Sequence, residues 1–167
     1  MQIHSTSDQA LPGLMTLYSS AFDDEDLRGL VSELVGRNDV LNLCAGPEDA
    51  PLGHVGFSLG QAGGQPVALL GPLAVMPSHQ KQGIGSALIH AGLDQLRTLG
   101  VAQVLVLGDP AYYSRSGFGT ERAVTPPYPL PAHWAEAWQS QMLNDGPAPS
   151  GMLEVPEPWM QAALWGE

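Results

Sequence analysis

The sequence has few positively charged residues, and this scarcity limits the partners that it can have. Six lysines and arginines stand against 17 aspartates and glutamates in 167 residues, which gives a formal net charge of −11. A chain with this charge repels nucleic acid and anionic lipid surfaces through its long-range field. We therefore expect neither nucleic acid nor a membrane among its partners.

Cysteine and long apolar runs are also scarce, which indicates a cytoplasmic protein. The single cysteine, Cys44, cannot form an internal disulfide, in keeping with a reducing compartment, and its apolar neighbours predict a buried thiol. No apolar stretch approaches the roughly 20 residues of a membrane helix, and residues 1–4 lack the layout of a signal peptide. We expect no metal site, because no residues have metal-ligand spacing, and a single domain over residues 1–167.

The stretch from residue 71 to residue 89 organises the rest of the chain. An apolar run ends at Met76 and is followed by a turn, a polar loop and a helical pattern. Gly83 and Gly85 stand where the helix would begin, and without a Cβ they let a ligand approach the backbone closely. The first amides of a helix have no intrahelical partner and carry partial positive charge. This order predicts a site for a phosphate or pyrophosphate.

Two common phosphate motifs do not fit this stretch. The P-loop needs a lysine after its second glycine, but Gly85 is followed by Ser86, and the dinucleotide fingerprint needs a third glycine where Leu88 stands. Gln80-x-x-Gly83-x-Gly85 resembles instead the acyl-CoA pyrophosphate loop of the GNAT superfamily of N-acetyltransferases, whose pattern is Gln/Arg-x-x-Gly-x-Gly/Ala. An unrelated nucleotide-binding α/β protein is the alternative.

A second motif about 30 residues downstream supports the same resemblance. The segment from Gly108 to Phe118 is similar to the GNAT pattern Ala…Tyr-x-x-x-Gly-Phe, with Tyr113 at the tyrosine position and Gly117 before the phenylalanine. Its sequence, Gly-Asp-Pro-Ala-Tyr-Tyr followed by Arg and Gly-Phe, resembles small stand-alone bacterial members of the superfamily more closely still. Together the two motifs cover roughly residues 66–120.

The resemblance implies a GNAT-type α/β (α+β) fold, with a mixed sheet of about six to seven strands that is splayed between the fourth and fifth strands and flanked by helices. We expect strands at 2–5, 40–45, 52–59, 66–75 and 101–107, and helices starting near Asp8 with Ser7 as cap, at 27–35 and at 83–99. The last of these helices would bury Leu88, Gly92, Leu96 and Leu99. Closing strands are expected at 134–143 and 152–155, although Trp134 could instead begin a short helix. Trp159 and Trp165 would pack the tail, residues 156–167, onto the domain or onto a second subunit.

The resemblance also implies acetyl-CoA as cosubstrate. Pro72 interrupts the strand at 66–75, which predicts a bulge or an edge; in the family this bulge opens a wedge for the pantetheine arm, here contacted by Leu73, Ala74 and Val75. An ordinary edge bulge is the alternative. The pyrophosphate would be held by Gln80, Lys81, Gln82, Gly83, Ile84, Gly85 and Ser86, and Lys81 is the only lysine in the chain.

Tyr113 is the expected general acid of an N-acetyltransferase. A phenol is protonated at neutral pH and can donate a proton to the departing coenzyme A thiolate. Tyr112 is the alternative donor, and both tyrosines could also simply pack their helix against the sheet. The acceptor would be a primary amine, small molecule or peptide, and the acidic chain would suit a cationic one. Asp23, Asp24, Glu25 and Asp26 would contact this amine or form a solvated helix start.

The sequence departs from the family at two places. Asp109 stands where many members have asparagine, and we expect it to cap the following helix. Many members also have a glutamate base in the bulged strand, whereas residues 67–75 contain no acid. His54, His79 and His133 are base candidates by pKa only. The missing acid leaves open a catalytically silent acyl-CoA-binding domain of the same fold, and a homodimer is also open.

Overall fold

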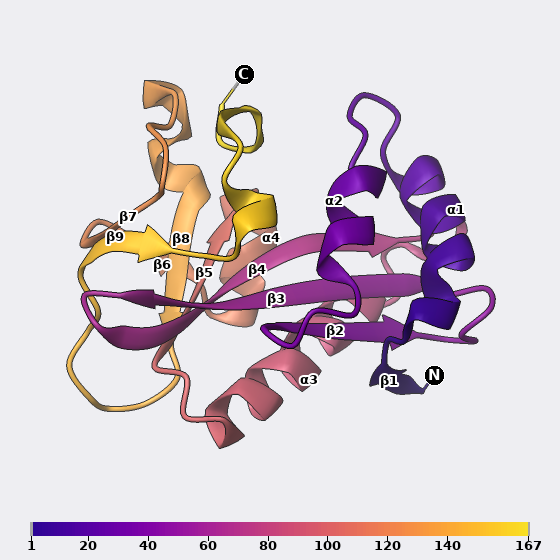
Figure 1. Cartoon of the computed structure of the whole chain (residues 1–167), viewed down its shortest axis with the longest axis horizontal. Coiled ribbons are helices and arrows are strands. Elements are labelled where there is room, and N and C mark those ends of the chain that lie inside the picture. Colours follow the sequence, from indigo (N-terminus) through magenta and orange to yellow (C-terminus); the bar gives the residue numbers. More distant parts are fainter. Residues whose placement is uncertain (1, 167) are drawn as a thin grey trace. The chain divides into compact units, whose positions relative to one another are not determined.

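The computed structural model describes residues 2–166, which form two compact units. Unit 1 runs to Phe57 and resumes at Gly71–Gly92, and unit 2 comprises Ser58–Leu70 and the chain from Leu93 onward. Two strands, β3 (Gly53–Ala62) and β4 (Gln65–Val75), and the helix α3 (Ile84–Thr98) contribute residues to both units. Figure 1 shows the elements along the chain.

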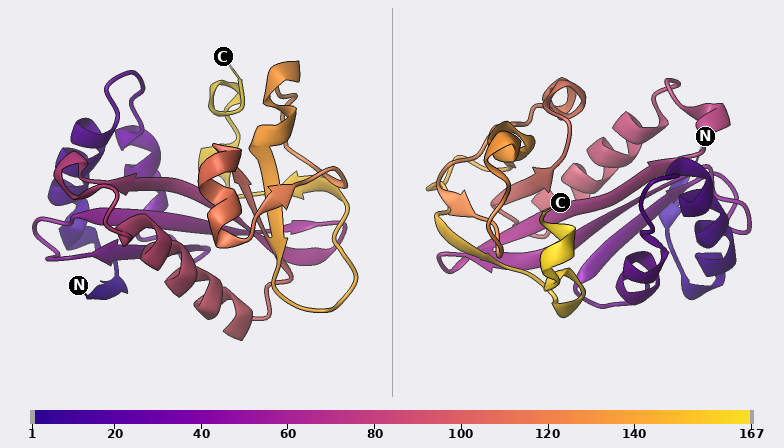
Figure 2. Two further views of the ribbon diagram at one scale, coloured as in Figure 1. Left: turned by 180° about the vertical axis from the view of Figure 1, so that it is seen from behind. Right: turned by 90° about the horizontal axis from the view of Figure 1, so that it is seen from above.

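Unit 1 contains the two N-terminal helices and the strands that they cover. Its other elements are β1 (Ile3–Ser5), a 3-10 turn (Asp8–Ala10), α1 (Leu11–Ala21), α2 (Arg28–Leu34), β2 (Val40–Ala45) and a second 3-10 turn (Pro77–His79). The strand order is β1-β2-β3-β4, and β1 is antiparallel to β2. The two helices lie on one face of these strands (Figures 1 and 2). Their apolar residues form one buried cluster with Cys44 of β2 and Ala74 of β4. As predicted, the thiol is buried.

Unit 2 is built on the parallel pair of β4 and β5 (Gln103–Leu107). The register of this pair runs from Val67 opposite Gln103 to Leu70 opposite Val106, and β4 continues beyond it through Gly71–Val75. On its other side β5 pairs antiparallel with β8 (Trp138–Met142), which also pairs with β6 (Gly119–Thr120). The remaining elements are α4 (Pro110–Tyr113), β7 (Val124–Thr125), β9 (Gly151–Glu154) and 3-10 turns at Ser114–Ser116, Ala132–Ala137, Glu157–Trp159 and Ala162–Leu164.

The C-terminal segment is fastened within unit 2 by tryptophan side chains. The indole of Trp159 donates to Ser58 Oγ at 2.9 Å, and that of Trp165 donates to the Trp159 carbonyl at 2.9 Å. The ring of Trp165 lies 5.7 Å from that of Trp138, and both are buried. The tail therefore packs onto its own chain, which was one of the two expectations, and not onto a second subunit. Because these rings are buried here, they are not offered to a second subunit.

Several expectations about local structure need correction. Within residues 2–166 the sheet has nine strands, of which seven follow the order β1-β2-β3-β4-β5-β8-β6, in agreement with the expected count, while β7 and β9 lie off this path. The Ser7 hydroxyl makes no cap bond and donates instead to the Glu48 carboxylate. Leu99 was expected to be buried by the helix at 83–99, but it is 64% exposed, because α3 ends at Thr98. Residues 132–137 form a 3-10 turn, so β8 begins only at Trp138.

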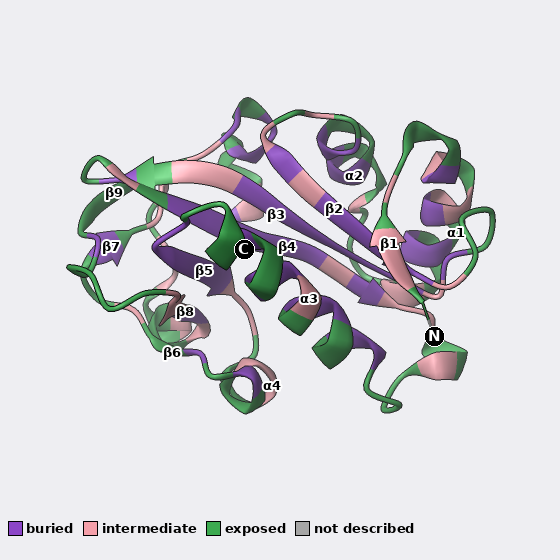
Figure 3. Cartoon of the chain, turned by 90° about the horizontal axis from the view of Figure 1, so that it is seen from below, coloured by how far each residue is buried: buried purple, intermediate pink, exposed green. Residues whose placement is uncertain are grey.

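The burial pattern otherwise follows the apolar periodicity. The central strands are buried, while the outer face of α3 is exposed (Figure 3). Leu88, Ile89, Leu93 and Leu96 are the buried side of that helix. Within residues 2–166, no helix is long and apolar enough to cross a membrane.

Candidate active site

The predicted phosphate loop of unit 1 connects the end of β4 to the start of α3. Lys81 has φ 63° and Gly83 has φ 87°, so the chain turns twice through the left-handed region before the helix. The first helical bond joins the Ala87 amide to the Gly83 carbonyl at 3.0 Å. The amides of Ile84, Gly85 and Ser86 therefore precede the first intrahelical donor, as an anion site at a helix start requires.

Exposure separates the loop into two groups of residues. Lys81, Gln82, Gly83 and Ser86 are exposed, whereas Ile84 and Gly85 are buried. No atom lies within 4 Å of a Cβ built on Gly83, so this glycine is needed for its positive φ and not for lack of space. The exposed group presents the loop backbone and one lysine to solvent.

The Gln80 side chain points back onto the strand. Its Nε2 donates to the Val75 carbonyl at 3.1 Å, which ties the loop to the end of β4. Of the three predicted pantetheine contacts, Leu73 and Val75 are half-buried, and Ala74 is in the core cluster of unit 1. Gln80 thus shapes the loop through its side chain, which the sequence pattern could not reveal.

Tyr113 of unit 2 lies at the end of the short helix α4. The Ala111 amide donates to Asp109 Oδ1 at 2.9 Å, and the amides of Tyr112 and Tyr113 donate to the Asp109 carbonyl. Asp109 is therefore the cap that the sequence predicted. Gly117, with φ 94°, ends the 3-10 turn that follows.

The ring of Tyr113 is held by other rings. It makes edge-to-face contacts with Tyr112 at 5.0 Å and with Phe118 at 5.8 Å between centroids. Burial raises the pKa of Tyr113 well above its usual value, and Tyr112 and Asp109 add to the effect. Burial also raises the pKa of Tyr112, but the guanidinium of Arg115, 5.6 Å from its ring centre, opposes this shift. Tyr113 is thus a phenol that keeps its proton at neutral pH.

His54, one of the three base candidates, is buried in unit 1 and held neutral. Asn42 donates Nδ2 to the Leu34 carbonyl, so its Oδ1 must accept from His54 Nε2, at 2.9 Å. Nδ1 therefore carries no proton and accepts from the Tyr18 hydroxyl at 2.7 Å. Burial lowers the pKa of His54 to about 3. A group with this pKa does not take up a proton at neutral pH, so His54 is unsuited to be the general base.

The other two histidines are more exposed than His54. His79 is half-buried beside the loop, and its Nδ1 shares a hydrogen bond of 2.8 Å with Ser78 Oγ. His133 is exposed, and its ring lies 6.0 Å from that of Trp134. These contacts do not single out either imidazole as the general base.

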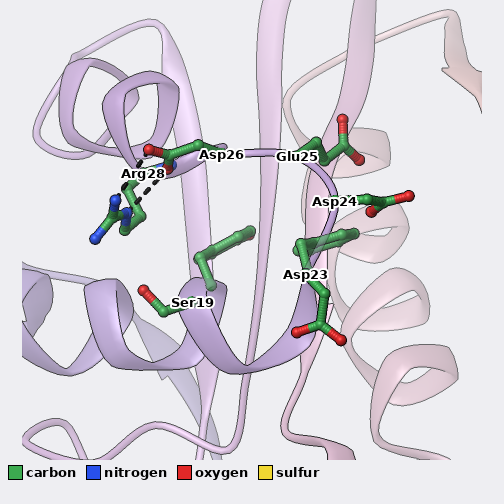
Figure 4. A pocket seen from close by; sticks show the side chains of 8 residues that line it. Ser19, Asp23, Asp24, Glu25, Asp26 and Arg28 are labelled. Atoms are coloured by element: carbon green, nitrogen blue, oxygen red, sulfur yellow. Dashed lines mark hydrogen bonds and ion pairs between the residues drawn. The ribbon is translucent and has the colours of Figure 1, made fainter.

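A pocket of about 410 Å³ lies between α1 and α2 in unit 1. It is lined by Tyr18, Ser19, Phe22, Asp23, Asp24, Glu25, Asp26 and Arg28. In Figure 4, Asp26 points to Arg28, with bonds of 2.9 and 3.0 Å, whereas the carboxylates of Asp23, Asp24 and Glu25 point away from this pair. The Arg28 guanidinium lowers the pKa of Asp26 to about 2. The acidic segment, for which the sequence left open an acceptor contact or a solvated helix start, thus lines a pocket.

The fold and the two motifs are those of a known family. The chain belongs to the Acetyltransferase (GNAT) family, whose model matches residues 11–118, and it is an N-acetyltransferase. It is 31% identical over 156 residues to the uncharacterized N-acetyltransferase YjhQ of Escherichia coli K12, with 89% of this chain and 81% of that protein covered. It is 37% identical over 113 residues to the uncharacterized N-acetyltransferase YhbS of the same strain, with coverages of 64% and 66%.

Solved structures of GNAT acetyltransferases are also similar to this chain. The crystal structure of Escherichia coli YhbS in complex with CoA has a TM-score of 0.83 and 28% identity, covering 96% of this chain and 92% of that one. A GNAT family acetyltransferase from Brucella melitensis in complex with acetyl-CoA has a TM-score of 0.73 and 28% identity, with coverages of 95% and 97%. The predicted fold class and enzyme class are therefore confirmed.

Proposed function

We propose that the chain transfers an acyl group, acetyl in the simplest case, from acyl-CoA to a primary amine. The observation that carries this proposal is the start of α3, where two left-handed residues, the exposed Lys81 and Gly83, precede three amides that come before the first intrahelical donor. Such a loop suits a pyrophosphate. The complexes of YhbS with CoA and of the Brucella protein with acetyl-CoA support the same ligand class for this chain.

The residues have distinct roles in this proposal. The loop from Gln80 to Ser86 binds the pyrophosphate, with Gln80 bracing it through Val75. Main-chain groups of residues 73–75, which continue β4 beyond its register with β5, bind the pantetheine arm. The two units together form one acetyltransferase domain, in keeping with a family match that includes residues of both.

The reaction is direct attack of the amine in a ternary complex. The neutral amine nitrogen forms a bond to the thioester carbonyl carbon, and the C–S bond then breaks to release a thiolate. Tyr113 gives its phenolic proton to that sulfur. Burial disfavours the phenolate, but it disfavours the thiolate as well, so the proton affinities of donor and acceptor rise together. Residues 67–75 contain no acid, and the low pKa of His54 makes it a weak base, so we assign removal of the amine proton to water.

The acceptor class follows from the pocket between α1 and α2. Its wall carries the carboxylates of Asp23, Asp24 and Glu25 in addition to the paired Asp26. Such a wall favours a ligand with positive charge. We therefore propose cationic amines with more than one charged group as the better acceptors.

A screen in two stages tests the proposed function. Acetyl-CoA alone should raise the melting temperature, because a ligand that binds only the folded state stabilises it. Thiol release from acetyl-CoA should then depend on added amine, and diamines should exceed monoamines of equal length. Stabilisation by acetyl-CoA without thiol release across the panel would identify a catalytically silent acyl-CoA-binding domain. That alternative is favoured by the missing acid in β4. Stabilisation by ATP but not by acetyl-CoA would contradict both.

A further inference from the structure

Gln139 of β8 has an unusual place for a polar side chain. It is 1% exposed and lies opposite Val106 of the buried strand β5. A buried amide has to find hydrogen-bond partners. Its Nε2 donates to the Gly108 carbonyl at 3.1 Å and to the Ala137 carbonyl at 3.3 Å. Both acceptors are main-chain groups outside the strand pairing of β5 and β8.

The Gly108 peptide is therefore held at both of its polar groups. Its amide donates to the Ala137 carbonyl at 2.9 Å, and its carbonyl accepts from Gln139. The Ala137 carbonyl receives both donors, so the three residues form a closed network. This network fixes the residue that directly follows β5.

The ring of Tyr113 rests on Gly108. A Cβ built on Gly108 would overlap carbons of the Tyr113 ring, so the aromatic ring occupies the space that any other residue would fill. The ring also makes edge-to-face contacts with Tyr112 and Phe118. The helix that carries Tyr113 has only four residues, too few to fix a side chain by its own stability. The Gly108 backbone is thus one of the surfaces that set the pose of the ring.

We propose that Gln139 is a positioning residue for Tyr113, because it fixes the Gly108 peptide on which the phenol ring lies. The inference rests on the proposed role of Tyr113 as general acid. Without the amide of Gln139, the Gly108 carbonyl loses its donor and turns toward other partners. The ring then tilts, and its hydroxyl no longer lies where the departing sulfur needs a proton.

The test compares two buried glutamines. Gln139→Met keeps the length of the side chain and removes the donor. Gln103→Met is the matched control, since Gln103 is also buried, on the adjacent strand β5, and donates to Glu121 Oε1 at 3.0 Å without a bond to Gly108. Both substitutions should lower the melting temperature, but only the first should disturb Tyr113.

The first readout is ionisation of the tyrosines, followed by their ultraviolet absorbance over the pH range in which circular dichroism shows an intact fold. In the parent protein, Tyr113 should keep its proton throughout this range. In Gln139→Met, Tyr113 should ionise within this pH range. The signal is assigned to Tyr113 if it is lost when Tyr113→Phe is added to Gln139→Met. Tyr112 and Asp109 are the titratable groups that act on Tyr113, Arg115 lies over the ring of Tyr112, and all three are the same in both variants.

The second readout is turnover with acetyl-CoA and the amine that gives the fastest thiol release. Gln139→Met should lower kcat about fivefold or more with KM for acetyl-CoA unchanged, whereas Gln103→Met should keep both. Unchanged ionisation of Tyr113 in Gln139→Met would overturn the proposal. A shifted ionisation together with full kcat in Tyr113→Phe would support the positioning and refute the acid role. If Gln139→Met does not fold, Gly108→Ala displaces the ring directly and should shift the same ionisation.

Discussion

Tyr112 and Tyr113 are adjacent in the chain, but their surroundings give the two phenols different properties. Tyr113 lies on Gly108 between two aromatic rings, and its burial raises its pKa. Tyr112 lies under the guanidinium of Arg115, which offsets part of the effect of burial. A general acid must keep its proton until the thiolate sulfur departs, and the buried environment of Tyr113 favours the protonated phenol. The difference favours Tyr113 over its neighbour as the acid.

We expect Tyr113→Phe to lower kcat by about 10²-fold or more, because a general acid contributes at least that factor. The affinity for acetyl-CoA should change less than about twofold, since the ring and its contacts remain. Steady-state kinetics and calorimetry measure the two quantities separately. Tyr112→Phe is the control and should retain most of the turnover. An equal loss of affinity and turnover in Tyr113→Phe would make the residue a binding contact.

His54 makes stability depend on pH. Its folded pKa of about 3 lies below its ordinary value of 6.5. Well above pH 6.5 neither the folded nor the unfolded state protonates this group, so it adds no pH dependence there. As the pH falls from 6.5 toward 3, the unfolded chain binds a proton that the folded protein refuses. The free energy of unfolding therefore decreases on acidification, by up to about 1.4 kcal/mol for each pH unit.

Urea unfolding at pH 7 and pH 5 measures this dependence. The parent protein should lose about 2 kcal/mol more than His54→Gln between these two pH values. His90→Gln, at an exposed position on α3, is the control and should behave like the parent. Equal losses in the parent and in His54→Gln would show that His54 titrates normally in the folded state.

At the scale of elements, the strand–loop–helix unit at 65–98 was predictable because its signals are local. A strand ends near a proline, two glycines open a helix, and Gly100 follows the helix end. The cap formed by Asp109 and the stop at Gly117 are equally local. Each of these local features depends on residues within a few positions of one another, and the family motifs give the order of the features along the chain.

Contacts between distant segments were not predictable in the same way. The bond from Gln139 to Gly108 spans 31 positions and depends on the register of β8 against β5. The bonds of His54 to Tyr18 and Asn42 depend on the packing of α1 against the strands of unit 1. The sequence alone left His54 as a candidate base. Its burial, which only the structure shows, lowers its pKa and makes it unsuited to that role.

At the scale of the molecule, opposite charges are distributed unevenly along an acidic chain. Three arginines, Arg28, Arg37 and Arg97, form ion pairs with aspartates two or three positions away. The only lysine lies exposed in the phosphate loop, whereas carboxylates line the pocket between α1 and α2. This arrangement suits two ligands of opposite charge, a polyanionic acyl donor and a cationic acceptor.

The central claim is that the start of α3 binds the pyrophosphate of an acyl-CoA, and calorimetry of acetyl-CoA binding tests it most directly. Gly83→Asp adds a side chain and a negative charge at the loop, and Gly64→Asp is the matched control. Both glycines have positive φ, 87° and 82°, and open space at the Cβ position, but Gly64 lies in the turn between β3 and β4. We predict that Gly83→Asp loses at least about tenfold in affinity, or about 1.4 kcal/mol, and that Gly64→Asp binds as the parent does. Equal affinities in all three proteins would contradict the account.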